Sequence, residues 1–410
     1  MMRRFDDPTG GRLDRFLSPT RNQGTMAQRM KTAELRIALF SGNYNITVDG
    51  ANKALNRLME FMLRKGAAVR VYAPQVADPA FAPTGELVGV PSVAIPTRSE
   101  YRFPLGLSAA NRADLESFAP NIVHIASPDI TAHRAVSWAR AKDIPVLASV
   151  HTRFETYPRY YNLGFTEPLI ESGLRRLYRR CDALVTPSQS MVDVLREQGM
   201  NRDISIWSRG VDRGVFSSDR RDLEWRRSLG IADGDVAIVF LGRLVMEKGL
   251  DVFAESIVAL RRSQVPHKVL VIGDGPARKW FEQNLPGGIF AGFQSGPDLS
   301  RALASGDVFF NPSITETFGN VTLEAMACGL PVVAAGATGS TSLVEDGVTG
   351  TLVGTLDPKA FADALAPYCT DPALRERHGA AGETRSRQYD WDSINQAVAD
   401  TYIRLVEARR

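Results

Sequence analysis

Cysteine and histidine are both scarce in this chain, which has three cysteines and five histidines among its 410 residues. The cysteines, Cys181, Cys328 and Cys369, lie far apart and show no C-x-x-C spacing. This pattern indicates neither a structural zinc site nor a disulfide framework. We therefore expect three small buried thiols in a reducing compartment.

Long apolar runs and an excess of one charge are also missing. No stretch approaches the ~18 apolar residues that a membrane span needs. The first residues contain arginines without the apolar run of a secretory signal behind them. The 49 basic and 46 acidic residues give a net charge of +3, which permits anionic ligands but predicts no nucleic-acid partner. The sequence predicts a cytoplasmic protein and leaves open a peripheral position on the inner face of the cytoplasmic membrane.

The chain does contain a repeated alternation of short apolar strands and amphipathic helices. Residues 1–33 are polar, basic and interrupted by Gly and Pro, so they predict a disordered tail, and whether this tail binds an anionic surface is left open. An alternation of strand and helix then predicts a parallel sheet with helices on both faces. The predicted strands are 36–42, 67–74, 121–127, 145–151 and 183–188, with helices at 51–66 and 129–143.

The same alternation restarts after a Gly- and charge-rich connector at 209–222. The second set of predicted strands is 236–242, 268–275, 288–293, 307–313 and 330–336. A chain of 410 residues is too long for one ordinary core. We therefore predict an α/β protein with two doubly wound, Rossmann-like domains, 34–210 and 211–386, facing each other across a cleft. The pattern of residues 387–410 predicts a C-terminal helix. In one arrangement this helix packs back on the first domain.

The stretch ETFGNVTLEAMACGLPVVA, residues 316–334, holds two carboxylates in one local pattern. Glu316 follows a predicted strand, and the apolar spacing behind it places Glu324 inside a helix that stops at Gly329. Amides at the start of a helix have no intrahelical partner and form a ready site for anions and hydroxyls. Here they belong to Phe318, Gly319, Asn320 and Val321. Taken singly, each glutamate is more simply explained as a helix cap or a solvated acid.

The whole pattern, E-x-F-G-x-x-x-x-E followed by A-x-G-x-P-V-V-A, resembles the motif of retaining GT-B glycosyltransferases, in particular glycosyltransferase family 4. The likeness covers about residues 35–385. It implies that Glu316 contacts hydroxyls of the donor sugar, that the amides of 318–321 hold the diphosphate and the sugar, and that Glu324 binds the ribose. It also implies that the first domain binds the acceptor and the second the nucleotide sugar. One departure is Thr-Gly-Ser at 338–340, where a Gly-Gly pair is usual.

Two cations follow the first predicted strand of the second domain. Arg243 and Lys248 lie in a G-R-L-x-x-x-K-G stretch, and without context they are two solvated surface charges. The stretch is similar to the diphosphate-binding loop of the family. Two cations placed there would stabilise a leaving nucleoside diphosphate electrostatically, without a metal.

Three glycines are further candidates for donor binding. Gly273 and Gly275 form part of a dinucleotide fingerprint whose third glycine is replaced by Arg278, so the match is weak. The segment is also similar to a G-x-G-P turn of the family. Gly50 precedes the predicted helix 51–66, where a side chain would keep a diphosphate away from the helix amides. It resembles the first glycine loop of the family, although a glycine in this place is often only a turn.

His151 ends a predicted strand and opens the stretch HTRFETYP. A histidine there is as well explained by a satisfied polar cap. Its context resembles family members in which the imidazole approaches the reacting sugar, and imidazole suits hydrogen bonding near a developing oxocarbenium. His151 is therefore the catalytic candidate of the first domain, and Arg153 and Tyr157 are predicted to shape the acceptor side.

Two D-x-D pairs, Asp233 with Asp235 and Asp390 with Asp392, match the pattern with which other glycosyltransferases hold a divalent metal. The first has the composition of a turn and the second that of a helix cap. No metal site and no cofactor are therefore predicted, and the nucleoside diphosphate sugar is a co-substrate.

A basic segment and one further motif bear on the acceptor. Residues 169–182 interleave four arginines with apolar residues, a pattern typical of either an anionic membrane surface or a solvated helix face. The stretch 205–216, with I-W-x-R-G-V-D-x-x-x-F, is similar to sulfoquinovosyl diacylglycerol synthases and to GDP-mannose-dependent α-mannosyltransferases. The first likeness favours a lipid acceptor.

The residues and the resemblance together predict a retaining, metal-independent glycosyltransferase. It would move a hexose from a UDP- or GDP-sugar to an alcohol acceptor on a membrane lipid such as diacylglycerol or a glycolipid. Three alternatives stay open: a sugar-nucleotide epimerase on the same fold, a mannosyltransferase with a soluble or polysaccharide acceptor, and a non-catalytic sugar-nucleotide sensor or scaffold. The sequence does not decide the sugar, the base or the acceptor.

Overall fold

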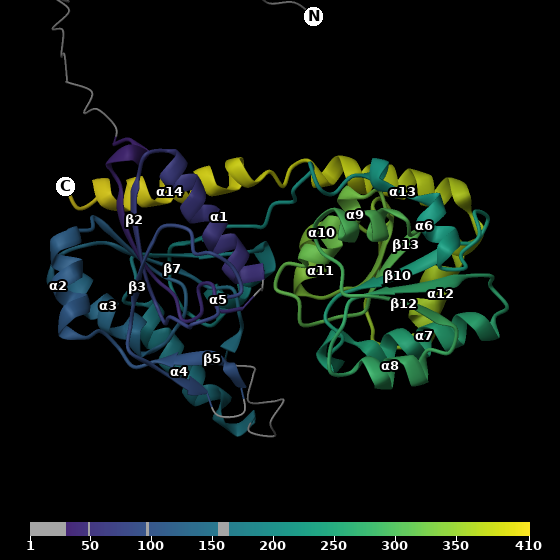
Figure 1. The fold of residues 1–410 in the computed structure, drawn as a ribbon, viewed down its shortest axis with the longest axis horizontal. Coiled ribbons are helices and arrows are strands. Elements are labelled where there is room, and N and C mark those ends of the chain that lie inside the picture. The colour runs from purple at the N-terminus through teal and green to yellow at the C-terminus, as the bar shows by residue number, and fades with distance from the viewer. Residues whose placement is uncertain (1–29, 48–49, 96–97, 155–163) are drawn as a thin grey trace, which may run out of the picture. The chain divides into compact units, whose positions relative to one another are not determined.

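The computed structural model describes residues 30–47, 50–95, 98–154 and 164–410. The chain divides into Met1–Met30 and Lys31–Arg410. The predicted tail, residues 1–33, lies almost wholly outside the described residues. A 3-10 turn at Thr32–Glu34 nevertheless begins within it. Residues 31–410 contain two parallel sheets with helices packed around them (Figure 1), and the predicted α/β class is confirmed.

The first sheet has seven strands in the order β3-β2-β1-β6-β7-β8-β9, and all its neighbours pair in parallel. Its inner strands are buried on both faces, which is why their sequences read as continuous apolar runs. The strands are β1 Arg36–Phe40, β2 Ala68–Ala73, β3 Glu86–Gly89, β6 Ile122–Ile125, β7 Val146–Ser149, β8 Ala183–Thr186 and β9 Ile204–Ile206. The helices are α1 Gly50–Arg64, α2 Ala109–Phe118, α3 Ile130–Ala141, α4 Glu167–Tyr178 and α5 Gln189–Glu197. An antiparallel hairpin, β4 Ser92–Ile95 with β5 Arg98–Pro104, is added to this domain.

The second sheet has six parallel strands in the order β12-β11-β10-β13-β14-β15. They are β10 Ala237–Leu241, β11 Lys268–Ile272, β12 Gly288–Gly292, β13 Val308–Asn311, β14 Val332–Ala335 and β15 Gly350–Val353. The helices are α6 Leu223–Ser228, α7 Leu250–Arg262, α8 Arg278–Asn284, α9 Gly296–Ala304, α10 Asn320–Ala327, α11 Thr338–Leu343, α12 Pro358–Thr370 and α13 Pro372–Ser386.

The strand order reverses once in each sheet, between β1 and β6 and between β10 and β13. At such a point the loops that leave two adjacent parallel strands run to opposite faces, and a crevice opens between them at the carboxyl ends. The loops after β10 and β13 contain Lys248 and Glu316. The fold therefore brings two predicted site residues to one place, although 68 positions separate them.

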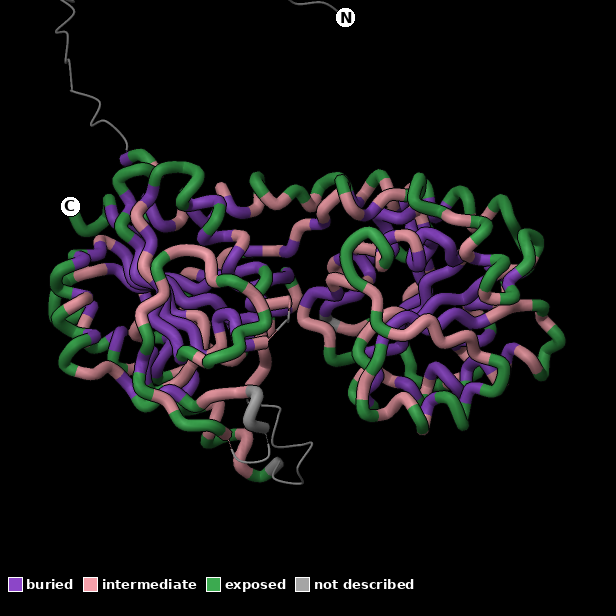
Figure 2. Tube along the Cα trace, viewed as in Figure 1, coloured by how far each residue is buried: buried purple, intermediate pink, exposed green. Residues whose placement is uncertain are grey.

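Buried aromatic side chains hold β10 and β13 in position. Phe240 and Phe310 come from these strands, and both contact Phe253 of α7, with ring centroids 5.4 and 4.7 Å apart. Burying such a side chain stabilises the fold by roughly 1.5–3 kcal/mol. Figure 2 shows the buried positions concentrated along the strands of each sheet and the exposed ones on the outer helices and loops.

The last helix, α14 Trp391–Glu407, packs against α1 and β6 of the first domain. Its buried Tyr402 hydroxyl lies 2.5 Å from Nδ1 of His124. Asn395 of the same helix accepts a hydrogen bond of 3.2 Å from the indole of Trp207. The C-terminal helix is thus part of the first domain's core, because its apolar face (Val398, Ala399, Tyr402, Ile403) is buried there.

Candidate active site

Lys248 and Glu316 form an ion pair at the switch point of the second sheet. Lys248 ends a 3-10 turn, Met246–Lys248, and Gly249 with a φ of 72° then starts α7. Glu316 lies in the loop after β13, and its Oε1 is 2.5 Å from the Lys248 ammonium. Both side chains are mostly buried, with 28% and 18% of their surface exposed. A ligand that uses either group must therefore approach both.

The N-terminus of α10 lies next to this ion pair in the chain. Gly319 is the N-cap with a φ of 96°, and its carbonyl accepts from the amides of Thr322 and Leu323. These are the first bonds of the helix, so the amides of Asn320 and Val321 have no intrahelical partner. The helix start thus offers donors for an anion beside a lysine and a carboxylate.

Gly339 of α11 allows this loop to pack closely. A Cβ atom at Gly339 would lie 2.8 Å from the carbonyl oxygens of Glu316 and Phe318. Any side chain there would displace the backbone of the site. The Thr-Gly-Ser departure at 338–340 thus keeps a glycine at the point of contact.

Glu324 is the second acid of the motif, and its environment differs from that of Glu316. Burial raises the pKa of Glu324 to about 7, and the positive charge of Lys53 in α1 acts against this rise. The carboxyl group of Glu324 forms no hydrogen bond with any residue that the structure describes. A carboxyl group without a partner in this position is available to accept hydrogen bonds from hydroxyl groups of a ligand.

His151 follows β7 and is 9% exposed. Its Nδ1 lies 2.8 Å from Nη2 of Arg209, and its ring contacts Trp207 edge-on at 5.1 Å. Burial, and then the charge of Arg209, hold the pKa of His151 well below its usual value, so the ring is neutral. Its Nε2 is buried without a hydrogen-bond partner among the described residues.

Thr317 joins the two halves of the site. Its hydroxyl donates to the carbonyl of His151 at 3.1 Å, and its own carbonyl accepts from the hydroxyl of Ser188 at 2.8 Å. Thr317 directly follows Glu316 in the chain. The structure therefore brings His151 of the first domain to the loop that carries Glu316.

The sequence predicted that Gly50 precedes a helix. In the structure Gly50 is instead the first residue of α1. A Cβ atom here would lie 2.5 Å from the side-chain amide of Asn320. The absence of a side chain at Gly50 thus makes room for the first residue of α10. Whether a diphosphate also approaches Gly50 stays a prediction.

Gly273 and Gly275 allow the loops after β10 and β11 to touch. A Cβ atom at Gly273 would lie 1.9 Å from the carbonyl of Gly242, and one at Gly275 would lie 2.5 Å from that of Leu244. Both glycines thus support the loop that carries Arg243 and Lys248. Arg243 itself is exposed and forms no ion pair with any described residue, so the structure does not join it to Lys248 and Glu316.

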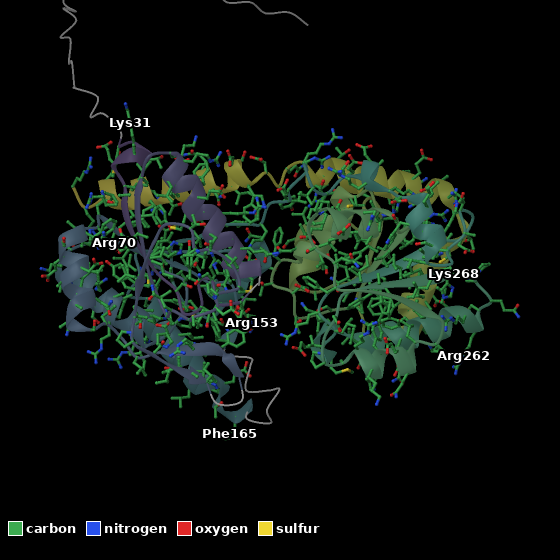
Figure 3. All side chains as sticks on the ribbon, viewed as in Figure 1. Lys31, Arg70, Arg153, Phe165, Arg262 and Lys268 are labelled. Atoms are coloured by element: carbon green, nitrogen blue, oxygen red, sulfur yellow. The ribbon has the colours of Figure 1, made fainter. Side chains whose placement is uncertain are left out.

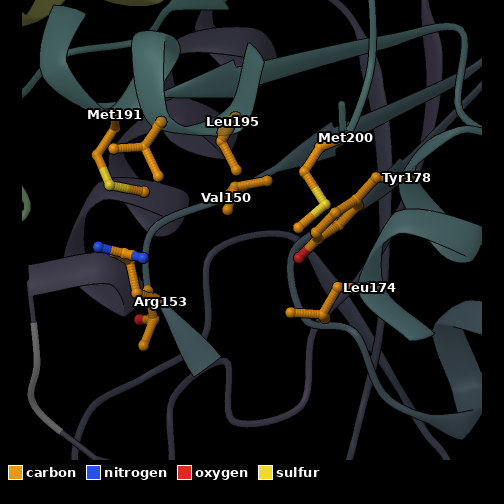
Figure 4. A pocket seen from close by; sticks show the side chains of 9 residues that line it. Val150, Arg153, Leu174, Tyr178, Met191, Leu195 and Met200 are labelled. Atoms are coloured by element: carbon orange, nitrogen blue, oxygen red, sulfur yellow. The ribbon is translucent and has the colours of Figure 1, made fainter. Parts of the chain in front are cut away.

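On the predicted acceptor side, Tyr157 lies outside the described residues. Arg153 lines a small pocket whose other walls are mainly apolar, and Figure 4 shows its guanidinium beside Met191. The side chains of Val150, Leu174, Tyr178, Met191, Val194, Leu195 and Met200 form most of the remaining wall. The pocket lies beside the end of β7, where His151 begins its loop.

Comparison with known proteins bears on the whole chain. The family model described as "Glycosyltransferase Family 4" matches residues 48–214, and that described as "Glycosyl transferases group 1" matches residues 235–371. A GDP-mannose-dependent alpha-mannosyltransferase of Mycolicibacterium smegmatis is 31% identical over 382 residues, which are 92% of this chain and 99% of the relative. The chain belongs to glycosyltransferase family 4.

A second relative agrees with the family assignment, and a solved structure agrees with the fold. A sulfoquinovosyl transferase of Arabidopsis thaliana is 30% identical over 373 residues, covering 88% of this chain and 72% of its own. The solved structure of sucrose-phosphate synthase from Thermosynechococcus elongatus aligns with a TM-score of 0.74 and 21% identity, over 91% of this chain and 99% of that one. The predicted GT-B fold is confirmed.

Both D-x-D pairs of the glycosyltransferase have structural partners. Asp235 accepts from the amide of Ala232 at 2.8 Å within a turn, and Asp233 pairs with Arg227. Asp390 accepts from the amide of Ser393 at 2.8 Å and caps α14. The predictions of a turn and of a helix cap are confirmed. Among the described residues, no cluster of three or more His, Cys, Asp or Glu side chains could hold a metal ion.

The basic segment 169–182 runs through α4 and four residues past its end, and three of its four arginines donate hydrogen bonds within the protein. Arg175 donates to the carbonyl of Gln198 and Arg179 to that of Gly199, each at 2.8 Å. Arg180 donates to the hydroxyl of Ser137, while Arg176 is exposed. None of the helices in the described part of the chain has the length and apolar character needed to span a bilayer.

Sequence reasoning missed several residues of this site. Arg209, Trp207 and Thr317 contact or orient His151, and Gly339 contacts the Glu316 loop. The sequence did give one signal, since Trp207 and Arg209 lie in the I-W-x-R-G-V-D stretch. The sequence did not reveal their role, because they follow β9 whereas their partner His151 follows β7, two strands away in the sheet.

Proposed function

We propose that this glycosyltransferase moves a hexose from a UDP- or GDP-sugar to a hydroxyl of a membrane lipid, with retention at the anomeric carbon and without a metal ion. The observation that carries the proposal is the Lys248–Glu316 ion pair at the start of α10, joined to His151 through Thr317. A cation and free amides for a diphosphate thus lie next to a carboxylate for sugar hydroxyls.

The leaving diphosphate develops negative charge as the glycosidic bond breaks. Lys248 and the amides of Asn320 and Val321 are positioned to stabilise that charge, and Arg243 is exposed in the same loop to join them. On ligand binding Glu316 exchanges part of its contact with Lys248 for sugar hydroxyls. Glu324 accepts from the ribose hydroxyls, and Lys53 favours its charged form.

Neither glutamate needs to be a covalent nucleophile in this scheme. Two-carboxylate glycosidase mechanisms need both acids beside the glycosidic bond, whereas here one acid is given to the sugar and the other to the ribose. The departing diphosphate then accepts the proton of the acceptor hydroxyl on the same face of the sugar, and configuration is retained.

The name of one relative indicates which donor nucleotide to test first. The mycobacterial relative is named as GDP-mannose-dependent, which makes GDP-mannose the first donor to test. A thermal-shift screen of UDP, GDP and ADP, with and without sugars, would identify the base, because a ligand that binds only the folded protein raises its melting temperature. A shift with none of these nucleotides would contradict the proposal.

A lipid acceptor is supported by the surface around α4. Phe165 and Leu169 are 79% and 76% exposed; Phe165 lies in the 3-10 turn Gly164–Thr166, and Leu169 lies in the first turn of α4, which follows it. Phe165 projects from the edge of the first domain in Figure 3. With the exposed Arg176 of α4, they offer apolar and cationic contacts to an anionic bilayer.

Vesicle flotation tests this part of the proposal. Phe165→Ser with Leu169→Ser should abolish binding to vesicles of phosphatidylglycerol and phosphatidylcholine, whereas Leu223→Ser on exposed α6 should leave it unchanged. Unaltered flotation of the double variant would contradict the assigned surface. Turnover of a diacylglycerol or glycolipid acceptor with each donor then tests the acceptor class itself.

Two further measurements test the chemistry. Activity should survive treatment with a chelator, and an enzyme that becomes inert and recovers only with Mn²⁺ or Mg²⁺ would contradict metal independence. Incubation of the protein with a radiolabelled UDP-sugar alone should leave the sugar unchanged. Conversion to an epimer without acceptor would favour the epimerase alternative instead.

A further inference from the structure

The ring of His151 is surrounded by groups that fix its position. Arg209 is 4% exposed and places Nη2 2.8 Å from Nδ1 of the imidazole. The other guanidinium nitrogen, Nη1, donates to the carbonyls of Trp207 and Ser208 at 3.0 and 3.1 Å. The guanidinium also stacks over the Trp207 ring, with 4.9 Å between Cζ and the ring centroid.

Trp207 is the second element of this arrangement. It is fully buried, contacts the imidazole edge-on, and donates its indole N–H to Asn395 of α14. Its backbone amide donates to the carbonyl of Thr186 at 2.8 Å, and the hydroxyl of Thr186 donates to the carbonyl of Val150 at 2.9 Å. The ends of β7, β8 and β9 are thus connected, and Arg209 has a fixed position relative to His151.

The chemistry of this contact determines where the imidazole proton lies. A guanidinium has only donors and stays protonated, so Nδ1 of His151 must accept the hydrogen bond from Arg209. In a neutral imidazole the proton is then on Nε2. Nε2 is buried and has no partner among the described residues, so an N–H donor is held there without an acceptor.

We propose that Arg209 is a positioning residue that holds His151 as the neutral Nε2–H tautomer, so that this N–H donates a hydrogen bond to a hydroxyl of the donor sugar. Arg209 acts through His151 and does not itself contact the sugar. In this form His151 cannot accept a proton at Nε2, so it orients the sugar and is not a general base. That the hydroxyl belongs to a donor sugar rests on the proposed function. The tautomer of His151 does not depend on it.

Nuclear magnetic resonance of ¹⁵N-histidine-labelled protein tests the tautomer directly. The chain has five histidines, and the His151 signals are identified as those lost in His151→Gln. They should show a protonated Nε2 and an unprotonated Nδ1, unchanged across the neutral pH range. The charged and titratable groups that act on this ring are Arg209 and His124. A protonated Nδ1, or a cationic ring at neutral pH, would overturn the proposal regardless of what the enzyme transfers.

Two substitutions at His151 separate the roles of its nitrogens. The amide of glutamine reaches the position of Nε2 and can donate there, whereas the amide of asparagine overlies Nδ1 and offers nothing at Nε2. His151→Gln should keep turnover within about tenfold of the wild type, while His151→Asn should lose roughly a hundredfold, as expected for one hydrogen bond made in the transition state. Equal activities, or a more active asparagine variant, would overturn the assignment.

Variants of Arg209 test the positioning role. Arg209→Met should lower kcat about tenfold to a hundredfold with a smaller change in KM, and should add a protonated Nδ1 signal for His151. Arg209→Lys keeps a cationic donor and should recover part of kcat and the original tautomer. Arg227→Met, at an exposed ion pair with Asp233, is the matched control. Full activity with unchanged His151 signals in Arg209→Met would overturn the proposal. Should Arg209→Met fail to fold, the wild-type spectrum and the two His151 variants decide.

Discussion

Nζ of Lys248 lies 2.5 Å from Oε1 of Glu316, and this pair joins the loops that follow the two central strands of the second sheet. The sequence suggested separate tasks, the diphosphate for the lysine and the sugar for the glutamate. The structure places both side chains in one mostly buried ion pair. Each group holds the other in position before a ligand arrives.

The first prediction concerns this ion pair. Glu316→Gln and Lys248→Met should each lower kcat/KM by at least about a hundredfold, and the double variant should cost little more than the worse single one, because residues that act as a unit are strongly non-additive. Lys359→Met, at an exposed pair with Asp363, is the control. Steady-state kinetics of the four proteins decides. Additive losses, or an active Glu316→Gln enzyme with intact fold, would show that the two groups work apart.

The second prediction concerns the stability effect of Glu324. Its folded-state pKa of about 7 exceeds the ordinary value of 4.5, so the folded protein binds this proton more tightly than the unfolded chain. Stability from this group is therefore greatest at low pH and falls as the pH rises from about 4.5 to about 7. Glu324→Gln should remove a cost on the order of 3 kcal/mol at pH 8 and have little effect near pH 4.

Unfolding measured at both pH values checks this second prediction, with Glu224→Gln on exposed α6 as the control. Glu324→Gln should also lose nucleotide affinity, because an amide is a poorer acceptor for two ribose hydroxyls than a carboxylate. Wild-type affinity should correspondingly weaken as the pH falls below about 7. A variant no more stable than the wild type at pH 8 would contradict the burial of this charge.

The third prediction concerns Gly273. Its φ is 137°, and an added Cβ atom would lie 1.9 Å from a backbone carbonyl that cannot move aside as a side chain would. Gly273→Ala should destabilise the fold by about 2–5 kcal/mol through strain and overpacking. Gly354→Ala, where a Cβ atom meets nothing within 4 Å, should have little effect. Chemical denaturation of both variants makes the comparison, and equal stabilities would refute the packing role.

The fourth prediction concerns Thr317. Thr317→Val keeps the shape of the side chain but removes the hydrogen bond to the carbonyl of His151, so the loop that carries Glu316 loses one of its links to His151. We expect kcat to fall about tenfold, since a neutral hydrogen bond is worth ~1 kcal/mol and an unpaired carbonyl costs more. Thr317→Ser keeps the hydroxyl and should behave like the wild type. A valine variant with wild-type kcat would show that this contact does not align the site.

Much of the fold could be predicted because most central strands are buried on both faces and therefore consist of apolar runs. Several of the missed strands differ in that respect. β3 has no buried residue and β9 has only three residues, so neither produces a readable pattern. The same holds for the hairpin β4–β5, whose Val93 is 48% exposed. Edge strands gain their place from a neighbour's hydrogen bonds rather than from their own apolar content.

The arginines of the basic segment 169–182 illustrate a second limit. Their spacing predicted a basic helix face, but Arg175 and Arg179 donate to carbonyls at the end of α5. A pattern of charges along one helix says which side chains share a face. It does not say which backbone acceptors another element brings to that face.

By itself, the sequence determined the chemical types at the site and the two parallel sheets, because apolar periodicity and local motifs act over a few residues. Only the tertiary structure decided that Lys248 pairs with Glu316, that Thr317 reaches His151, and that Arg209 contacts its imidazole. These contacts join residues 58 to 166 positions apart. They exist because strand order brings distant loops to one edge of a sheet, and no local pattern encodes that order.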